Sequence, residues 1–153
     1  MGQYYAVYET KFGFFRIEVE DNKITYLRKV ETHDDTGEKT PLTDQVLREL
    51  SEYFNGKRKC FDFPYTLRGT DFQRKMWQAL CDIPYGETRS YKQIAETVGN
   101  PKAYRAVGMA NNKNPIIIAV PCHRVIGTDG KPVGYAGGID MKNELLHLEQ
   151  SKG

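Results

Sequence analysis

The sequence is poor in cysteine and has no long hydrophobic run. Three of its 153 residues are cysteines, and the mean hydropathy is −0.62. A small, odd number of cysteines argues against a disulfide framework. No segment approaches the roughly 20 apolar residues of a transmembrane helix, and residues 1–8 lack the features of a secretory signal. We therefore expect a cytoplasmic protein with no membrane partner, in which one thiol could be reactive.

A strong net charge is also lacking, since the formal charge is +2. The charges are nevertheless uneven: residues 1–87 carry 13 basic and 15 acidic side chains, and residues 88–153 carry nine and five. Such a basic stretch is typical of a protein with an anionic partner, although a solvated surface has the same composition. Within it, residues 89–131 carry seven basic side chains opposed only by Glu96 and Asp129: Arg89, Lys92, Lys102, Arg105, Lys113, Arg124 and Lys131.

Residues 1–66 predict a small α+β domain. Residues 4–9, 12–20 and 24–30 are rich in aromatic and β-branched side chains, which favours an antiparallel three-stranded sheet. A polar loop follows, and apolar residues then recur at helical spacing from Pro41 until Gly56. Residues 57–69 show no clear period and are a candidate linker.

Residues 67–153 predict a mostly helical domain with short strands. Gly99 ends one of its helices, and Asn100-Pro101 is expected to cap and begin another after a very short turn. Two short helices joined in this way indicate a helix-turn-helix, although many helical hairpins share the pattern. Capping boxes begin the two preceding helices: Thr70 with Gln73, and Ser90 with Gln93.

The helix after Pro101 has two contrasting faces at about 100° per residue. One face carries small residues suited to packing on the preceding helix: Ala103, Ala106, Val107 and Ala110. An exposed arginine, an asparagine and a glycine that permits close approach suit a nucleic-acid groove, but a solvated helix face would look the same. The residues of this second face are Arg105, Gly108, Met109 and Asn112.

Cys122 is the cysteine with a chemical context. It follows the apolar residues 116–120, which predict a buried strand, and it precedes His123 and Arg124. A neighbouring histidine and arginine lower the pKa of a thiol from its usual value of about 8.5 and so favour a nucleophilic thiolate. Cys60 and Cys81 have no histidine within five residues, and we interpret them as buried structural cysteines.

The order and spacing of motifs across residues 70–149 resemble those of the O6-alkylguanine-DNA alkyltransferases, also called methylated-DNA–protein-cysteine methyltransferases. Residues 1–66 resemble this family only in length and in the plan of strands followed by a helix, which in the family is a ribonuclease H-like domain. The matching motifs are Asn114-Pro115, Pro121-Cys122-His123-Arg124-Val125, Gly134-Tyr135-Ala136-Gly137-Gly138 and Leu145-Leu146-His147-Leu148-Glu149.

The resemblance implies a single-turnover DNA repair enzyme. It would move the alkyl group of O6-alkylguanine, and in some cases of O4-alkylthymine, irreversibly from duplex DNA to Cys122. His123 would act as a general base through a water, Glu149 would orient the imidazole, and Asn114 would support the site through hydrogen bonds. Since one protein accepts one alkyl group, we expect a monomer.

The resemblance also implies that the target base is flipped out of the duplex. Tyr91 would help to turn the nucleotide out, and Arg105 would fill its place from a helix in the minor groove, with Gly108 and Asn112 on the same DNA-binding face. Many relatives carry serine where Ala136 stands, so a hydroxyl contact is lost there. The guanine pocket would be lined by Tyr91, Val125, Tyr135 and Ala136.

No metal or cofactor is expected. Some members of the family hold zinc through cysteine and histidine in the N-terminal half, but Cys60 and His33 are the only such residues before Cys81. His147 is expected on the exposed side of the last helix. The glycines at 134, 137 and 138 do not follow the spacing of a phosphate-binding fingerprint.

Three other functions remain open on the sequence. An alkyltransferase-like protein would recognise the lesion without repairing it, but such proteins typically carry tryptophan at the cysteine position. A sequence-specific helix-turn-helix regulator has no need of a Cys-His-Glu set. A cysteine peptidase fits Cys122 and His123 alone and does not account for the basic helix-turn-helix pattern.

Overall fold

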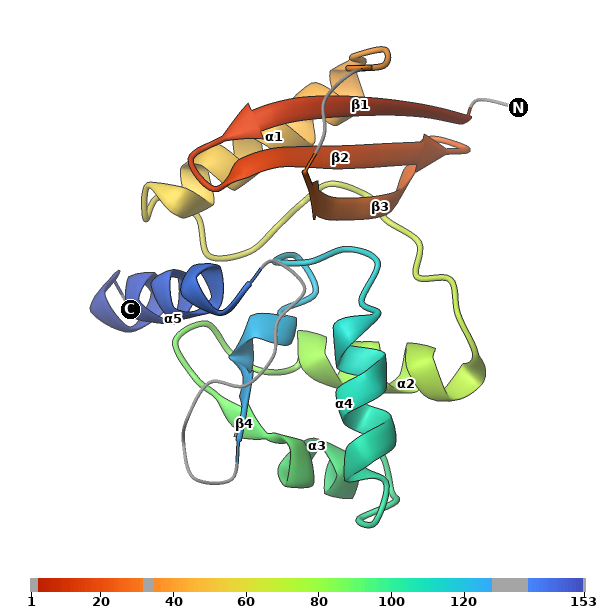
Figure 1. The fold of residues 1–153 in the computed structure, drawn as a ribbon, viewed down its shortest axis with the longest axis vertical. Helices are drawn as coiled ribbons and strands as arrows, with labels where there is room; N and C mark the ends of the chain where they lie inside the picture. The colour runs from red at the N-terminus through yellow and green to blue at the C-terminus, as the bar shows by residue number, and fades with distance from the viewer. Residues whose placement is uncertain (1–2, 32–34, 128–137, 153) are drawn as a thin grey trace. The chain divides into compact units, whose positions relative to one another are not determined.

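The computed structural model describes residues 3–152 except 32–34 and 128–137 (Figure 1). The chain forms two compact units, Met1–Leu67 and Arg68–Gly153. The first is a three-stranded antiparallel sheet with one helix and the second is mostly helical, so the predicted α+β class is confirmed. Among the described residues, no helix has the length and apolar character needed to cross a membrane.

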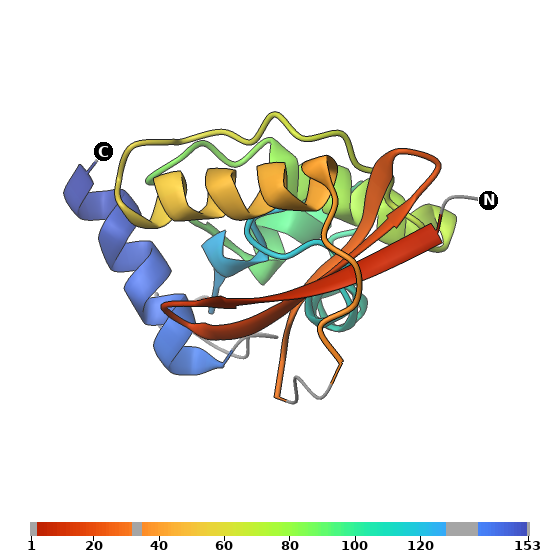
Figure 2. The ribbon, with the colours of Figure 1, turned by 90° about the horizontal axis from the view of Figure 1, so that it is seen from above.

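The first unit is a meander of three strands, β1 (Gln3–Thr10), β2 (Gly13–Glu20) and β3 (Lys23–Val30), in that spatial order. Alternate side chains of β2 are buried, as the period-2 pattern of its sequence predicts. Helix α1 (Pro41–Phe54) packs against β1 and β2 and lies along the sheet (Figure 2). It begins at Thr40, whose hydroxyl accepts a hydrogen bond from the Thr43 backbone.

The hairpin between β2 and β3 turns at Asp21 and Asn22, which have φ angles of 54° and 63°. Both lie in the left-handed region, the conformation that a two-residue type I′ turn requires. Asparagine and aspartate tolerate this region better than most residues, because a short polar side chain can hydrogen-bond locally. The Asp-Asn dipeptide therefore suits the turn that joins β2 to β3.

Residues 57–67, expected to form a linker, are part of the first unit. The buried carboxylate of Glu49 accepts hydrogen bonds from the backbone of Asp62 at 2.7 Å and of Phe63 at 3.4 Å. Backbone hydrogen bonds also join Ile24 to Pro64 and Thr66, each at 2.9 Å. The linker prediction was wrong because these bonds are formed by groups far away in the sequence.

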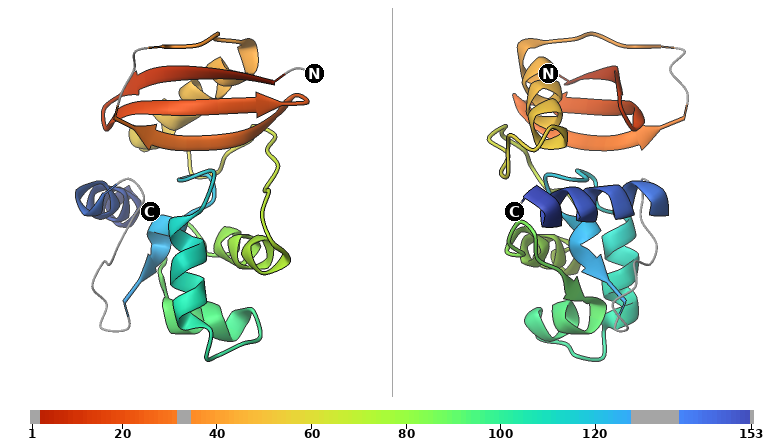
Figure 3. Two further views of the ribbon diagram at one scale, coloured as in Figure 1. Left: turned by 45° about the vertical axis from the view of Figure 1, so that its right-hand side comes forward. Right: turned by 90° about the vertical axis from the view of Figure 1, so that its left-hand side faces the viewer.

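In the described part of the second unit, there are five helical segments and two short strands. Helices α2 (Asp71–Cys81), α3 (Tyr91–Thr97) and α4 (Tyr104–Asn112) pack on one another, and a short loop joins α3 to α4 (Figure 3). The other elements are β4 (Arg89–Ser90), the 3-10 helix η1 (Cys122–Arg124), β5 (Val125–Ile126) and α5 (Ile139–Lys152). Both predicted capping boxes, at Thr70 and Ser90, are present.

Helix α4 differs from its prediction. It begins after Ala103, which makes no side-chain cap, whereas Asn100-Pro101 lies in the preceding turn. Its buried residues are Val107, Ala110 and Asn111, whereas Ala106 is exposed. Packing on α2 sets the buried side, because the Trp77 indole N–H donates to the Ala110 carbonyl oxygen at 2.8 Å.

Residues 116–120 are buried as expected, but they do not form a strand. Ile116 accepts a hydrogen bond from the Val120 backbone at 3.1 Å, which closes a tight turn. Within the turn Ile118 has a φ of 74°. A β-branched residue is a clear outlier in this region, so the surrounding contacts hold the backbone in a strained conformation.

Candidate active site around Cys122

The short parallel pairing of β4 with β5 brings distant parts of the second unit together. Arg89 lies opposite Val125, and Ser90 lies opposite Ile126. Tyr91 is the next residue after β4, and the chain reaches β5 directly from η1, so this pairing places Tyr91 near Cys122. Burial and the negative charge of a Cys122 thiolate both raise the pKa of Tyr91, which keeps its phenol neutral.

Asn114 holds the turn that delivers the chain to Cys122. Its amide donates to the Val120 carbonyl at 2.7 Å, and its side-chain oxygen accepts from the Ile116 backbone at 3.0 Å. The side chain is fully buried. Asn114 therefore satisfies the backbone groups of residues that would otherwise need a strand partner, which explains why an apolar run here is a turn.

Cys122 is the first residue of η1 and has no exposed surface. Its backbone N–H donates to the Val120 carbonyl at 2.8 Å, so the strained turn directly fixes its position. Cys60 and Cys81 are exposed, so their interpretation as buried structural cysteines was wrong. Cys81 is the last residue of α2, and Cys60 lies in the segment after α1, on surfaces that the sequence pattern around them did not reveal.

His123, Arg124 and Glu149 form a buried charged cluster. The His123 Nε2 atom lies 2.7 Å from Oε2 of Glu149. Arg124 donates from Nε and Nη2 to the two carboxylate oxygens at 2.8 and 2.9 Å, and from Nη1 to the Ile83 carbonyl at 2.7 Å. The backbone of Gly86 adds a further donor to Glu149 at 3.3 Å.

The pKa shifts assign protons within this cluster. Burial lowers the pKa of His123, so its imidazole is neutral near pH 7. Burial alone would raise the pKa of Glu149, but hydrogen bonds from His123 and Arg124 outweigh it and hold this pKa well below its usual range. An ionised carboxylate only accepts, so the proton of the neutral imidazole sits on Nε2, and Nδ1 is the ring atom with basic character.

Arg124 was predicted as part of a basic surface and as the cation beside the thiol. It is instead buried, and its guanidinium is bound to Glu149 and to a backbone carbonyl. The sequence shows an arginine next to Cys122 but not the carboxylate, 25 residues later, that binds it.

Lys142 is a buried cation that the sequence analysis missed. It lies on α5 with no exposed surface, and its ammonium donates to the Val125 carbonyl at 2.5 Å. Burial lowers the pKa of Lys142 to about 8, and the negative charge of a Cys122 thiolate opposes this shift. At about 100° per residue Lys142 falls on the same face of the last helix as Met141 and Leu145, which was the available signal.

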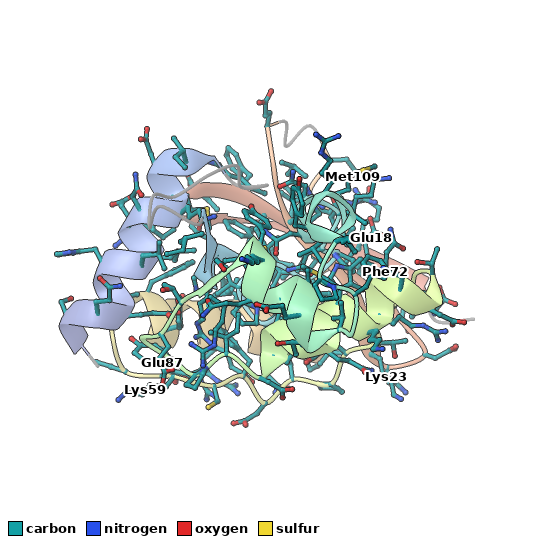
Figure 4. All side chains as sticks on the ribbon, turned by 90° about the horizontal axis from the view of Figure 1, so that it is seen from below. Glu18, Lys23, Lys59, Phe72, Glu87 and Met109 are labelled. Carbon is teal, nitrogen blue, oxygen red and sulfur yellow. The ribbon has the colours of Figure 1, made fainter. Side chains whose placement is uncertain are left out.

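The residues predicted to contact DNA lie on α4. Arg105, Met109 and Asn112 are exposed, with Met109 63% accessible, and Met109 projects from the helix (Figure 4). Gly108 is half-buried, and a Cβ atom there would lie 3.8 Å from the Tyr91 ring. The Tyr91 ring thus lies beside the α4 backbone at a distance that would also accommodate a Cβ atom.

Some of the predicted residues lie outside the described part of the chain. These include Tyr135 and Ala136, predicted for the guanine pocket, together with Lys131 and His33. Val125, the other predicted pocket residue, is fully buried in β5. Among the residues that the structure describes, no three histidine, cysteine, aspartate or glutamate side chains are grouped as metal ligands.

A buried cysteine beside a neutral histidine and an ionised glutamate, in a mostly helical unit, is an arrangement typical of proteins with a cysteine nucleophile. Comparison with known families agrees. Residues 71–151 match the DNA binding domain of 6-O-methylguanine DNA methyltransferase, and residues 3–67 match its ribonuclease-like domain. The chain belongs to the 6-O-methylguanine DNA methyltransferase family.

Individual relatives match over nearly the whole chain. The methylated-DNA–protein-cysteine methyltransferase of Methanosarcina barkeri is 46% identical, with 97% of this chain and 98% of that protein covered. The constitutive enzyme of that name from Bacillus subtilis is also 46% identical, over 96% and 95%. The crystal structure of Mycobacterium tuberculosis OGT in complex with DNA has a TM-score of 0.89 and 45% identity, covering 97% of this chain and 93% of that one.

Proposed function

We propose that this protein repairs O6-alkylguanine in duplex DNA by transferring the alkyl group irreversibly to Cys122. The observation that carries the assignment is the position of Cys122, fully buried at the start of η1 beside the His123–Glu149 pair. Relatives of almost the same length and close to half-identical in sequence are named methylated-DNA–protein-cysteine methyltransferases. The protein is consumed in the reaction, so it is a single-turnover enzyme.

The chemistry follows from the assigned protons. The Cys122 thiol passes its proton through a water to Nδ1 of His123, while Glu149 holds the ring by Nε2. The thiolate sulfur forms a bond to the alkyl carbon as the bond from that carbon to O6 breaks, and the electron pair moves to O6. The proton held by His123 returns to the departing guanine, because burial makes the imidazolium a ready donor.

Lys142 and Tyr91 complete the environment of the thiolate. The ammonium of Lys142, with its pKa of about 8, is mostly charged at neutral pH and stabilises negative charge on Cys122. Tyr91 contributes a neutral phenol, which does not repel the thiolate. Neither contribution needs a metal or a cofactor.

The DNA binds to the second unit, with α4 in the minor groove. A thiolate inside the protein reaches only a base that has left the stack, and unstacking costs a few kcal/mol. Arg105, exposed on α4, fills the vacated space, and Tyr91 turns the nucleotide toward Cys122. We place residues 67–153 as the DNA-binding and alkyl-acceptor domain, acting as a monomer in the cytoplasm.

The test is mass spectrometry after mixing the protein with a duplex that contains one O6-methylguanine. We expect one added methyl per protein, mapped to Cys122, and none with an undamaged duplex. Cys122→Ala should bind the lesion duplex but gain no mass. Methyl uptake by that variant would overturn the assignment, and tight lesion binding without uptake by the natural protein would favour a recognition protein that does not repair.

A further inference from the structure

Asn111 links the outer, DNA-facing helix to the reactive cysteine, and nothing in the mechanism above uses it. It lies in the last turn of α4, one residue before the exposed Asn112, and is 1% exposed. Its amide donates to the carbonyl oxygen of Cys122 at 3.3 Å. A polar side chain is buried at a cost unless its hydrogen bonds are made, so its place in an otherwise apolar helix face needs a reason.

The same side chain reaches Tyr91. A hydrogen bond from Asn111 lowers the pKa of Tyr91, against burial and the Cys122 charge, which both raise it. A bond that acts in this direction is donated to the phenol oxygen. An amide carries two N–H groups, so Asn111 can serve the Cys122 carbonyl and the Tyr91 hydroxyl together.

The residues that Asn111 connects come from three elements. Tyr91 begins α3, Asn111 belongs to α4, and Cys122 begins η1. On α4 the close approach of the Tyr91 ring to Gly108 gives a second contact one turn earlier. The Tyr91 ring therefore lies beside the helix that carries Arg105, and Asn111 of that helix acts on its phenol.

We propose that Asn111 is a positioning residue. It holds the Tyr91 hydroxyl and the Cys122 backbone in fixed positions relative to α4. DNA bound on the outer face of α4 then meets a pocket whose two functional side chains are already placed relative to that helix. Asn111 does not touch the reacting atoms. It acts through Tyr91 and Cys122, and this role rests on the proposed alkyl transfer.

The test separates binding from the rate of transfer. In single-turnover experiments with saturating protein, Asn111→Leu, which is close in size and lacks both donors, should lower the rate constant of methyl transfer by about 10- to 100-fold. The affinity for the same duplex should change by less than about threefold, because the outer face of α4 is unaltered. Asn111→Ser keeps one donor, so its rate constant of methyl transfer should lie between those of Asn111→Leu and the natural protein.

A merely structural role would give a different result. It would lower the fraction of protein that reacts, measured as the amplitude, and leave the rate constant of the remaining folded protein unchanged. Val107→Ala, a buried change on the same helix without a hydrogen bond to Cys122, is the matched control for this behaviour. A natural rate constant in Asn111→Leu or Asn111→Ser would overturn the inference.

The Asn111→Leu substitution made together with Tyr91→Phe tests whether Asn111 acts through the Tyr91 hydroxyl. If Asn111 acts partly through the Tyr91 hydroxyl, Asn111→Leu should slow transfer less in that background than in the natural protein. Equal slowing in both backgrounds would remove Tyr91 from the proposal. Absence of methyl transfer by the unaltered protein would instead refute the proposed function, so the two failures are distinct.

Discussion

Arg124 holds the carboxylate of Glu149 by two hydrogen bonds, with Nε to Oε1 at 2.8 Å and Nη2 to Oε2 at 2.9 Å. This fork geometry fixes the plane of the carboxylate as well as its position. The same Oε2 atom binds the His123 ring, so the orientation of the imidazole depends on a guanidinium that does not contact it through any bond described here. Arg124 therefore fixes the position of Glu149 and, through Glu149, the orientation of the His123 ring.

Removal of this guanidinium should destabilise the protein strongly. In Arg124→Met the Glu149 carboxylate stays buried without its main partner, and loss of one partner of a buried ion pair costs about 3–5 kcal/mol. Urea unfolding measures the free-energy change. Arg74→Met is the control, because Arg74 pairs with Asp71 on the exposed surface of α2, where such pairs contribute about 0–1 kcal/mol. Equal losses in the two variants would contradict the interpretation.

Stability should fall as the solution becomes acidic. The unfolded chain protonates His123 below about pH 6.5, whereas the lowered pKa in the folded protein keeps the ring neutral. The lowered pKa of Glu149 adds a second loss below about pH 4.3, where the unfolded carboxyl takes up a proton first. Each group contributes up to about 1.4 kcal/mol per pH unit.

Urea unfolding at pH 7.5, 6 and 5 follows the effect of the histidine. The decrease in the free energy of unfolding between pH 7.5 and pH 5 should vanish in His123→Gln. It should persist in His147→Gln, because His147 is exposed. A stability of the unaltered protein that does not change between pH 7.5 and 5 would argue against a neutral buried imidazole.

Lys142→Met should stabilise the fold and impair the reaction. Because the pKa of Lys142 is about 8 in the folded protein, the natural protein loses stability as the pH falls from about 10 to 8, where the unfolded chain keeps the proton. The variant should lack this loss and be more stable at pH 7 by about 1–3 kcal/mol. Methyl transfer should be at least about tenfold slower, because the thiolate loses its neighbouring cation.

Thermal unfolding across pH and single-turnover transfer measure the two effects of Lys142. The exposed Lys75→Met on α2 should alter neither. Transfer at the natural rate in Lys142→Met would show that the ammonium does not assist Cys122.

Arg105→Ala should slow repair in duplex DNA more than in a single strand. A single strand has no stacked partner whose place must be filled, so the variant should lose about 10- to 100-fold in rate with duplex and less than about threefold with a single-stranded oligonucleotide. Single-turnover rates with both substrates provide the comparison. A similar loss on both would indicate that Arg105 serves general DNA affinity.

Asn22→Gly should stabilise the first unit by about 0.5–1 kcal/mol. Asn22 has a φ of 63° in the type I′ turn, a conformation that glycine adopts without steric cost. The melting temperature should rise while the rate of methyl transfer stays the same. A lower melting temperature would mean that the asparagine side chain contributes more than the backbone preference.

Local patterns accounted for much of the fold. The capping boxes at Thr70 and Ser90 and the alternation in β2 depend on residues a few positions apart, and the structure contains all of them. The start of α4 and the turn at residues 116–120 were predicted wrongly, because capping and hydrophobicity patterns do not show which backbone groups are hydrogen-bonded. Asn114 in particular replaces a strand partner with its own side chain.

Motif spacing identified the residues of the candidate site. It did not predict the charges and hydrogen bonds around them. His123 and Glu149, which the resemblance paired, lie 2.7 Å apart from Nε2 to Oε2. The partner of Arg124 and the burial of Lys142 follow from how α5 packs near η1, which no local pattern encodes. Asn111 was missed because its hydrogen bond to the Cys122 carbonyl joins two different elements, which no local pattern encodes.

Trp77 is the single tryptophan of the chain, is buried, and donates its indole N–H to the carbonyl of Ala110 in α4. Indole emission depends on the hydrogen bond and polarity around the ring. The chain therefore carries an intrinsic fluorophore whose emission reports on the packing of α2 against α4. Binding of DNA, alkylation of Cys122 and unfolding of the second unit can each be followed through this one optical signal without an added label.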